Sequence, residues 1–335
     1  KELVDAKAPY RLNQYLYVAG GKGKASQERL PEGALSISTP AKATLRKLKL
    51  GELGEAMIVE TSAAMTPKIT SVVVVWNDVK RIDLANHVNK SQTYEKEAVY
   101  FAFPFAAQKP TFRYEIPAGI VCANSDMLPG ACLDWFTVQH FVEIEGADAT
   151  ITWATPDAPL VCFQDINRGK WQTQLPLVNG HVYAYVMNNY WFTNYLAGQG
   201  GDFAFRFAIT SQPRPDRVAS ARFGWDASNP LLASVVDANP QGRLAAPAAG
   251  LVSITEPNVF LVGARPAAEG NAFTFRLWEL TGRPTTAHVR LTSIPARKAT
   301  ACNLVEEPRG PLEIAADGTI AVPIRASGLA AVCVE

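Results

Sequence analysis

The stretch EAVYFAFPF, residues 97–105, carries the clearest fold signal in the sequence. Its apolar side chains Val99, Phe101, Phe103 and Phe105 recur at every second position and therefore share one side of an extended chain. The same two-residue period occurs in GDFAFRFAIT (201–210), where Arg206 falls on the opposite side, and in NAFTFRLWEL (271–280). This alternation predicts half-buried β-strands.

Other segments also favour strands over helices. SVVVVW (71–76) is a continuous apolar run and predicts a strand that is covered on both faces. Turn signals separate the strands: PEG, PAG, LPG, VNG, PQG and DGT. We expect at most one helix, around residues 226–236, and no alternation of strands with helices. The sequence therefore predicts an all-β protein built on a large antiparallel sandwich.

The domain division rests on one change in composition. ANPQGRLAAPAAG (238–250) is rich in Ala, Pro and Gly and poor in large apolar residues, which is typical of a linker. We therefore expect a large β-sandwich domain over residues 1–245 and a small C-terminal β-sandwich over 246–335.

Composition excludes several classes of partner. The formal net charge is +1 and the basic residues do not cluster, which argues against a nucleic-acid or membrane partner. No long apolar run is present, and the first residues lack the pattern of a leader peptide. The five cysteines form no CxxC pair. Buried free thiols are favoured over a bridge between Cys122 and Cys132, and a reducing, cytoplasmic compartment is slightly favoured.

Catalytic motifs are scarce in this sequence. None of the four histidines lies at metal-ligand spacing from another histidine or a cysteine, so no metal site is expected. Asp126, Asp134 and Asp157 lie in apolar, proline-flanked stretches. A buried aspartate can act as a general acid or base, although capping a turn is the more common role and is favoured here.

The segment YAYVMNNYWFTNY (183–195) combines aromatic and amide side chains without any charge. One interpretation is packing, in which Trp191 and Tyr195 anchor a loop and the asparagines bind backbone groups. The other is a sugar site, because aromatic rings stack on sugar CH surfaces and amides pair with hydroxyls. The residues alone leave both open.

Six blocks in this order carry a family resemblance: EAVYFAFPF, FRYEIPAGIV, LPGACLDWFTVQHFVEI, ATPDAPL, YVMNNYWFTNYLAGQGGDFAFRFAI and FRLWELTGR. The series resembles the C-terminal β region of bacterial glycoside hydrolase family 38 proteins, the α-mannosidase family. The opening KELVDAKAPYRLNQYLYV fits as well. The resemblance covers nearly the whole chain, and DWFTVQ and NNYW-x-TNY are its most specific parts.

The resemblance implies a fold and an activity. Family 38 enzymes are retaining α-mannosidases that hold zinc and an aspartate nucleophile in an N-terminal α/β barrel, followed by a helical bundle and β domains. Their large sandwich resembles the supersandwich of galactose mutarotases. Because nothing in this sequence looks like the barrel, we expect an N-terminally truncated accessory β region that binds no zinc of its own and is inactive alone. Its expected partners are the missing catalytic domain, a mannoside-like carbohydrate and, through the exposed interdomain face, a second copy.

The candidate carbohydrate-binding or interdomain residues are Asn188, Asn189, Trp191, Asn194 and Tyr195, followed by Asp134 and Trp135. We expect them at one end of the large sandwich, in or beside a concave surface. Two alternatives stay open. A stand-alone carbohydrate-binding sandwich would bind sugar without a barrel, and a mutarotase-type epimerase would need a glutamate base close to a histidine acid.

Overall fold

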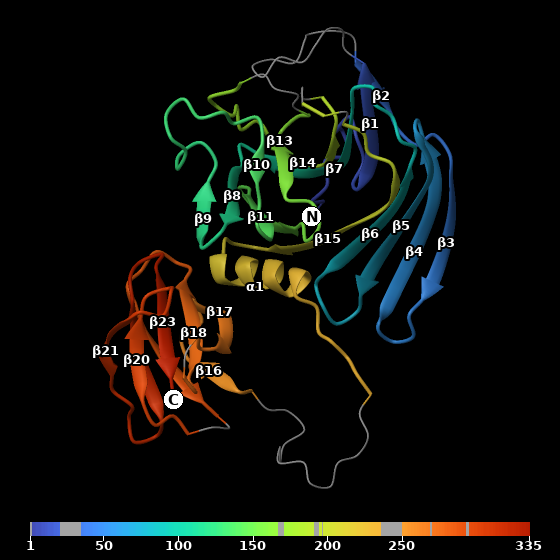
Figure 1. Cartoon of the computed structure of the whole chain (residues 1–335). Helices are drawn as coiled ribbons and strands as arrows, with labels where there is room; N and C mark the ends of the chain where they lie inside the picture. Colours follow the sequence, from blue (N-terminus) through green and yellow to red (C-terminus); the bar gives the residue numbers. More distant parts are fainter. Residues whose placement is uncertain are drawn as a thin grey trace. The chain divides into compact units, whose positions relative to one another are not determined.

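The computed structural model describes residues 2–20, 35–166, 171–190, 194–195, 197–235, 250–268, 270–292 and 295–335. The chain divides into two compact units, Lys1–Pro230 and Leu231–Glu335 (Figure 1). The predicted boundary at residues 245–246 and most of the linker 238–250 lie outside the described residues. Within the described residues, no helix has the length and apolar character needed to cross a membrane.

The N-terminal unit consists of two antiparallel sheets. A six-stranded sheet has the order β10-β13-β14-β7-β1-β2. Its strands are β1 (Gln14–Gly20), β2 (Leu35–Ser38), β7 (Glu97–Gln108), β10 (Phe136–Thr137), β13 (Leu160–Phe163) and β14 (Asn179–Asn188). A nine-stranded sheet has the order β3-β4-β5-β6-β15-β12-β11-β8-β9. Its strands are β3 (Ala43–Lys49), β4 (Gly54–Ala63), β5 (Thr66–Trp76), β6 (Ile82–Lys90), β8 (Thr111–Ile116), β9 (Gly119–Cys122), β11 (Phe141–Glu145), β12 (Thr150–Ala154) and β15 (Gly201–Gln212). The prediction of an all-β fold on a large antiparallel sandwich is confirmed.

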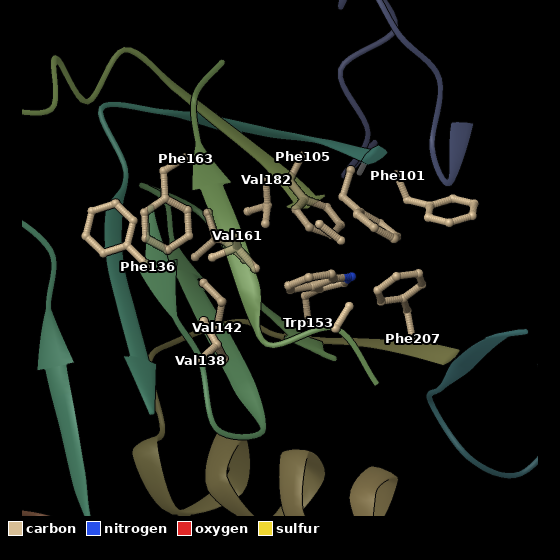
Figure 2. Packing of buried hydrophobic residues seen from close by; sticks show 14 of the residues in the cluster. Phe101, Phe105, Phe136, Val138, Val142, Trp153, Val161, Phe163, Val182 and Phe207 are labelled. Atoms are coloured by element: carbon tan, nitrogen blue, oxygen red, sulfur yellow. The ribbon is translucent and has the colours of Figure 1, made fainter. Parts of the chain in front are cut away.

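The main core of this unit is an aromatic cluster that contains residues of both sheets (Figure 2). The rings of Phe103 and Trp153 lie 4.9 Å apart between centroids, and Trp153 stacks on Phe207 at 5.4 Å. These residues come from β7, β12 and β15 in turn. The two-residue period of 97–105 and 201–210 therefore places their aromatic side chains inside the sandwich, as predicted.

Strand β7 is buried on both faces, although its alternation predicted a half-buried strand. Residues Glu97–Phe105 are all buried. A second cluster on the other face of the six-stranded sheet includes Tyr100, Tyr183 and Tyr185, and the rings of Tyr100 and Tyr185 stack at 4.4 Å. The period of a strand reports which side chains share a face, but not whether a further layer covers the opposite face.

The run SVVVVW behaves in the opposite way, and its prediction was wrong. Val72, Val73 and Val74 of β5 are only half-buried, and Val75 is 50% exposed. The run lies close to the β3 edge of the nine-stranded sheet, where every residue of β3 is exposed (Figure 1). The six-stranded sheet does not cover this edge of the nine-stranded sheet. An apolar run at this position is therefore not a core strand.

The single helix of the described residues, α1, spans Arg217–Ser228, so the prediction of a helix around 226–236 was largely wrong. Asp216 caps its N-terminus, because its side chain accepts a hydrogen bond from the Ala219 N–H at 3.0 Å. The helix ends before Pro230, which cannot continue it. Gly224 packs on Phe141 so closely that a Cβ would lie 2.7 Å from the ring, which brings the helix onto the nine-stranded sheet.

The C-terminal unit has its own core between two small sheets. One has the order β16-β19-β22 and the other β17-β18-β23-β20-β21. The strands are β16 (Val252–Ile254), β17 (Val259–Pro266), β18 (Phe273–Glu279), β19 (Thr285–Leu291), β20 (Ala299–Cys302), β21 (Pro308–Leu312), β22 (Thr319–Ile324) and β23 (Leu329–Val334). Phe275 and Leu277 of β18 enter this core as predicted, whereas Phe273 is 44% exposed.

Candidate carbohydrate-facing site

Two crossover loops lie at one end of the large sandwich. Residues 91–96 connect β6 to β7, and residues 189–200 connect β14 back to β15. Gly201 pairs with Lys90, so the two loops meet at the same end of the sheets. A Cβ on Gly198 would lie 2.8 Å from the Tyr94 ring, and one on Gly200 would lie 2.7 Å from the Gln92 backbone nitrogen. The glycines that follow the aromatic segment therefore allow the loops to pack closely.

The asparagines of this segment are bound to backbone groups where they leave β14. The Asn189 N–H donates to the Glu97 carbonyl at 2.8 Å, and its side-chain amide donates to the Glu95 carbonyl at 3.0 Å. The Asn188 side-chain oxygen accepts from the Tyr190 N–H at 2.9 Å. Asn188 and Asn189 thus fix the start of the loop, as the packing interpretation expects.

The end of the segment has a different character. Asn194 and Tyr195 are both exposed, and 68% of Tyr195 is accessible to solvent. Trp191 lies outside the described residues. The segment therefore divides into a fixed, half-buried start and an exposed polar and aromatic end.

A buried ion pair lies beneath these loops. The Lys90 Nζ is 2.7 and 2.8 Å from the two carboxylate oxygens of Glu97, and it also donates to the Ser91 carbonyl at 2.7 Å. The Tyr17 ring lies 5.4 Å from the ammonium, and burial together with the Glu97 carboxylate raises the pKa of Tyr17. Because Lys90 ends β6 and Glu97 begins β7, the pair ties the two sheets together at this end.

Asp134 and Trp135 serve separate contacts. The buried Asp134 carboxylate accepts hydrogen bonds from the backbone N–H groups of Trp171 and Gln172 at 2.7 and 2.9 Å. Trp135 packs against the second aromatic cluster, which also contains Tyr190. Trp135 is thus brought into one cluster with the amide segment, whereas Asp134 orders the loop at 171–172.

An open pocket of about 430 Å³ lies on the nine-stranded sheet where the 189–200 loop rejoins it. It is lined by Lys68, Thr70, His87, Val88, Asn89, Asp202, Phe203 and Ala204. The Asn89 side-chain amide donates to the Asp202 carboxylate at 2.8 Å. The sequence analysis did not single out these polar residues. Those on β6 and β15 alternate along their strands with the buried residues Val88 and Phe205.

The structure pairs three of the four histidines with carboxylates. His140 Nδ1 lies 3.0 Å from Glu115, whose other oxygen accepts from the Trp225 indole N–H at 3.0 Å. This buried glutamate thereby joins His140 and helix α1 to β8. The Glu–His proximity that an epimerase needs is present, but the two groups bind each other and the glutamate also holds Trp225. His181 and His288 pair with Asp5 and Glu256.

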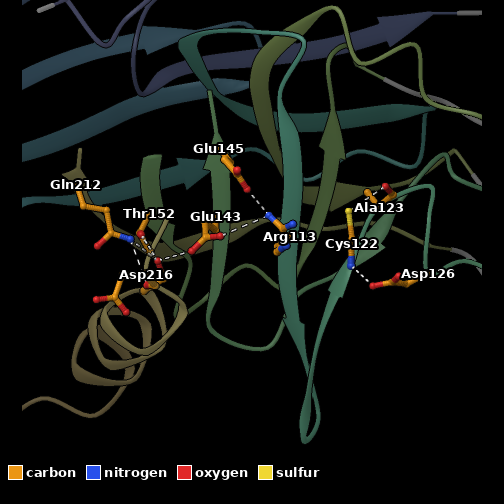
Figure 3. Close-up of polar contacts among 10 residues, drawn as sticks. Arg113, Cys122, Ala123, Asp126, Glu143, Glu145, Thr152, Gln212 and Asp216 are labelled. Atoms are coloured by element: carbon orange, nitrogen blue, oxygen red, sulfur yellow. Dashed lines mark hydrogen bonds and ion pairs between the residues drawn. The ribbon is translucent and has the colours of Figure 1, made fainter. Parts of the chain in front are cut away.

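A second buried carboxylate also holds the helix (Figure 3). Ser220 of α1 donates to Glu143 at 2.7 Å, and Arg113 lies 3.9 Å from the same carboxylate. Burial raises the pKa of Glu143. Asp126 accepts from the Cys122 N–H at 2.7 Å (Figure 3), and Asp157 pairs with Arg206 at 2.8 Å. The aspartates considered for acid–base chemistry therefore hold turns and neighbouring strands.

The comparisons with known proteins agree with this architecture. Residues 258–326 match the glycosyl hydrolases family 38 C-terminal beta sandwich domain. These residues form a family 38 C-terminal β-sandwich domain. No curated protein matches the chain.

A likeness in fold to solved family 38 proteins extends over both units. The crystal structure of a glycosyl hydrolase family 38 protein from Enterococcus faecalis superposes with a TM-score of 0.72 at 14% identity, covering 96% of this chain and 40% of that protein. An α-mannosidase from Enterococcus faecalis V583 gives the same TM-score and identity and is covered over 38% of its length. The chain thus spans about two-fifths of the length of these family 38 proteins. The resemblance to the family 38 β region is confirmed.

Proposed function

We propose that this chain is the accessory, non-catalytic β region of an α-mannosidase-like family 38 protein, and that one end of its large sandwich lends polar groups to a carbohydrate cleft. The observation that carries the proposal is the coverage, because 96% of the chain corresponds to two-fifths of a family 38 protein. The family 38 domain within residues 258–326 supports the same assignment.

The chemistry of the loop end supports contact with a sugar. Asp202 and Asn89 present a carboxylate and an amide side by side, and Lys68 and Thr70 add an ammonium and a hydroxyl across the same pocket. Such groups donate to and accept from sugar hydroxyls. The exposed ring of Tyr195, on the loop that leads to this pocket, offers a stacking surface.

The described residues of this chain do not fit the zinc ion of the family. Among the described residues, no group of three His, Cys, Asp or Glu side chains is arranged to hold a metal ion. We propose that bond cleavage takes place in another domain of the protein. The epimerase alternative is not favoured, because Glu115 and His140 bind each other and Trp225.

The exposed edge of the nine-stranded sheet is a candidate contact for the catalytic domain. Leu45 and Val75 lie on the same face of the nine-stranded sheet as the core residues. They lie outside the core, however, and are 58% and 50% exposed to solvent. Exposed apolar side chains of this kind mark surfaces that another domain covers. The same surface should favour homodimers when the catalytic domain is absent. Sedimentation of the isolated chain measures whether such dimers form.

The test combines activity with sugar binding. We expect the isolated chain to hydrolyse no 4-nitrophenyl α-mannoside with or without added zinc. We expect methyl α-mannoside to perturb NMR signals of Asn89, Asp202 and the 194–200 segment only at millimolar concentration. In a protein that joins the chain to a family 38 catalytic domain, Asp202→Ala should lower kcat/KM and leave the unfolding midpoint unchanged.

Two outcomes would overturn the proposal. Turnover by the isolated chain would make it an enzyme in its own right. Micromolar sugar affinity without a catalytic domain would instead establish the stand-alone binding module. The matched control is Asp78→Ala, which removes an exposed carboxylate that does not line this pocket and should leave kcat/KM unchanged.

A further inference from the structure

Two cysteines of the C-terminal unit lie in contact on neighbouring strands. Cys302 ends β20 and Cys333 lies in β23, and these strands pair antiparallel with Thr300 opposite Cys333. The two residues are therefore diagonal neighbours, and their Sγ atoms are 2.9 Å apart. Both are free thiols. Cys333 faces away from the core because Val332 and Val334 take the inward positions.

The thiol pair is accessible from solvent. It lines an open pocket of about 450 Å³ whose other residues are Ala267, Ala268, Ala272, Lys298, Thr300, Val305, Glu306, Glu307, Pro308 and Glu335. Both cysteines are partly exposed, whereas Cys162 in the large sandwich is fully buried. Of these three thiols, the pair at Cys302 and Cys333 is the one that a small reagent can reach in the folded protein.

The surroundings favour a bond between the sulfurs over a metal site. Besides the Cys333 sulfur, Cys302 contacts the Thr300 carbonyl at 3.4 Å, and Cys333 contacts the Thr274 hydroxyl at 3.6 Å. The nearby Glu306 carboxylate is already paired with Arg265 and with the Ala268 N–H. Among the described residues, no group of three His, Cys, Asp or Glu side chains is arranged to hold a metal ion, and so none includes this pair. A shift of less than about 1 Å, by contrast, brings the two sulfurs to the bonding distance of about 2.05 Å.

We propose that Cys302 and Cys333 are a modification site that forms an intramolecular disulfide with low-molecular-weight disulfides such as oxidised glutathione. The thiolate of one cysteine attacks a glutathione sulfur, the S–S bond of the reagent breaks, and a glutathione thiolate leaves and takes up a proton. The second cysteine then loses its proton and attacks the protein sulfur of the mixed disulfide, releasing the second glutathione. Two protein thiols are oxidised, and one oxidised glutathione is reduced to two thiols.

The bond would close a covalent loop from β20 to the last strand. β23 lies between β18 and β20 in the five-stranded sheet. A cross-link at this position restricts the unfolded chain and resists separation of β23 from its neighbour. The site therefore couples the stability of the family 38 domain to the thiol–disulfide balance of its surroundings.

The test treats the full chain with oxidised glutathione under native conditions, blocks free thiols and digests the protein with trypsin. We expect the peptides 299–309 and 326–335 to be joined by a disulfide, the thiol count of the folded protein to fall by two, and the unfolding midpoint to rise. The midpoint should return to its starting value after reduction. Cys302→Ser and Cys333→Ser should each abolish both the linked peptides and the rise.

The control is the double variant Cys122→Ser and Cys132→Ser, which should form the linked peptides as readily as the unchanged chain. The proposal is overturned if Cys302 and Cys333 each end as stable mixed disulfides with glutathione, or if both stay reduced while oxidised glutathione modifies other cysteines. If Cys302→Ser fails to fold, Cys302→Ala serves the same comparison.

Discussion

Lys90 and Glu97 form an ion pair that is almost completely removed from water, with 2% of each residue exposed. The two residues terminate strands of different sheets, so the pair closes the sandwich beneath the amide-rich loop. Each charge depends on the other, because an isolated charge at this depth lacks the solvation that water supplies.

Removing one partner should therefore be costly. We expect Glu97→Gln to destabilise the chain by about 3–5 kcal/mol, because it leaves the Lys90 ammonium without its counter-charge. The double variant Lys90→Met with Glu97→Leu should recover much of that loss. Urea unfolding measures all three proteins. Glu60→Gln, which breaks an exposed pair with Lys68, should cost less than about 1 kcal/mol, and equal losses for the two single variants would contradict the prediction.

Glu279 should make stability depend on acid. Its buried carboxylate accepts hydrogen bonds from Asn258 and Thr281 side chains and from backbone N–H groups, including that of Ser327. Although burial alone raises it, these hydrogen bonds lower the pKa to about 2 from the ordinary 4.5. The folded state then binds this proton less readily than the unfolded state, so the contribution is complete above pH 4.5 and disappears as the pH falls toward 2.

The corresponding variant tests this window. Glu279→Gln should cost on the order of 3 kcal/mol at neutral pH, and the difference from the unchanged chain should shrink between pH 4.5 and 2. Denaturant unfolding at several pH values measures it. Glu55→Gln, at an exposed position, serves as the control. A difference that does not depend on pH would show that Glu279 contributes through packing.

Cys302 should react slowly at neutral pH. Burial and the hydrogen bond with Cys333 raise its pKa to about 11 from 9.0, so the thiolate, which is the reactive form, is scarce. Charged side chains that line the same pocket are those of Lys298, Glu306, Glu307 and Glu335. Alkylation of Cys302 by iodoacetamide, followed in peptide 299–309, should accelerate from pH 8 to 11 in the folded chain. In urea the rate of alkylation should level off near pH 9. A rate that also levels off near pH 9 in the folded chain would refute the prediction.

The loop contact at Gly200 should be intolerant of a side chain. A Cβ there would lie 2.6–2.8 Å from the Cβ, backbone nitrogen and Cα of Gln92. Gly200→Ala must therefore push the two crossover loops apart, at a cost of about 1–3 kcal/mol. Ala197→Ser, on the same loop, provides the comparison. Thermal unfolding and the NMR signals of residues 91–96 measure the effect, and unchanged signals would exclude the contact.

The sequence predicted the fold where local patterns decide it. The periods of β7, β15 and β18 correctly assigned Phe101, Phe207 and Leu277 to a core. These local patterns did not predict whether a second layer covers the other face of a strand. That depends on which strands pair, and the paired strands are often far apart in the sequence. For that reason β7 proved buried on both faces, whereas Val75 proved half exposed.

The sequence indicated one part of the candidate site and overlooked another. The amide segment was expected at one end of the large sandwich, and Asn188 is the last residue of β14. Whether its residues line a carbohydrate cleft stays a prediction. The pocket residues His87 and Asp202 were overlooked because single polar side chains on the outer face of a strand carry no spacing signal. They meet only when β6 and β15 pair.

The position of β15 between β6 and β12 has a consequence for synthesis on the ribosome. β6 ends at Lys90, and its partner begins only at Gly201, about 110 residues later. At ordinary translation rates of roughly 5–20 residues per second, the β3–β6 block waits many seconds with an unpaired edge. An open edge of this kind recruits other strands, including those of neighbouring nascent chains. Expression yield should therefore depend on chaperones that cover this edge during synthesis more than on the final stability of the protein.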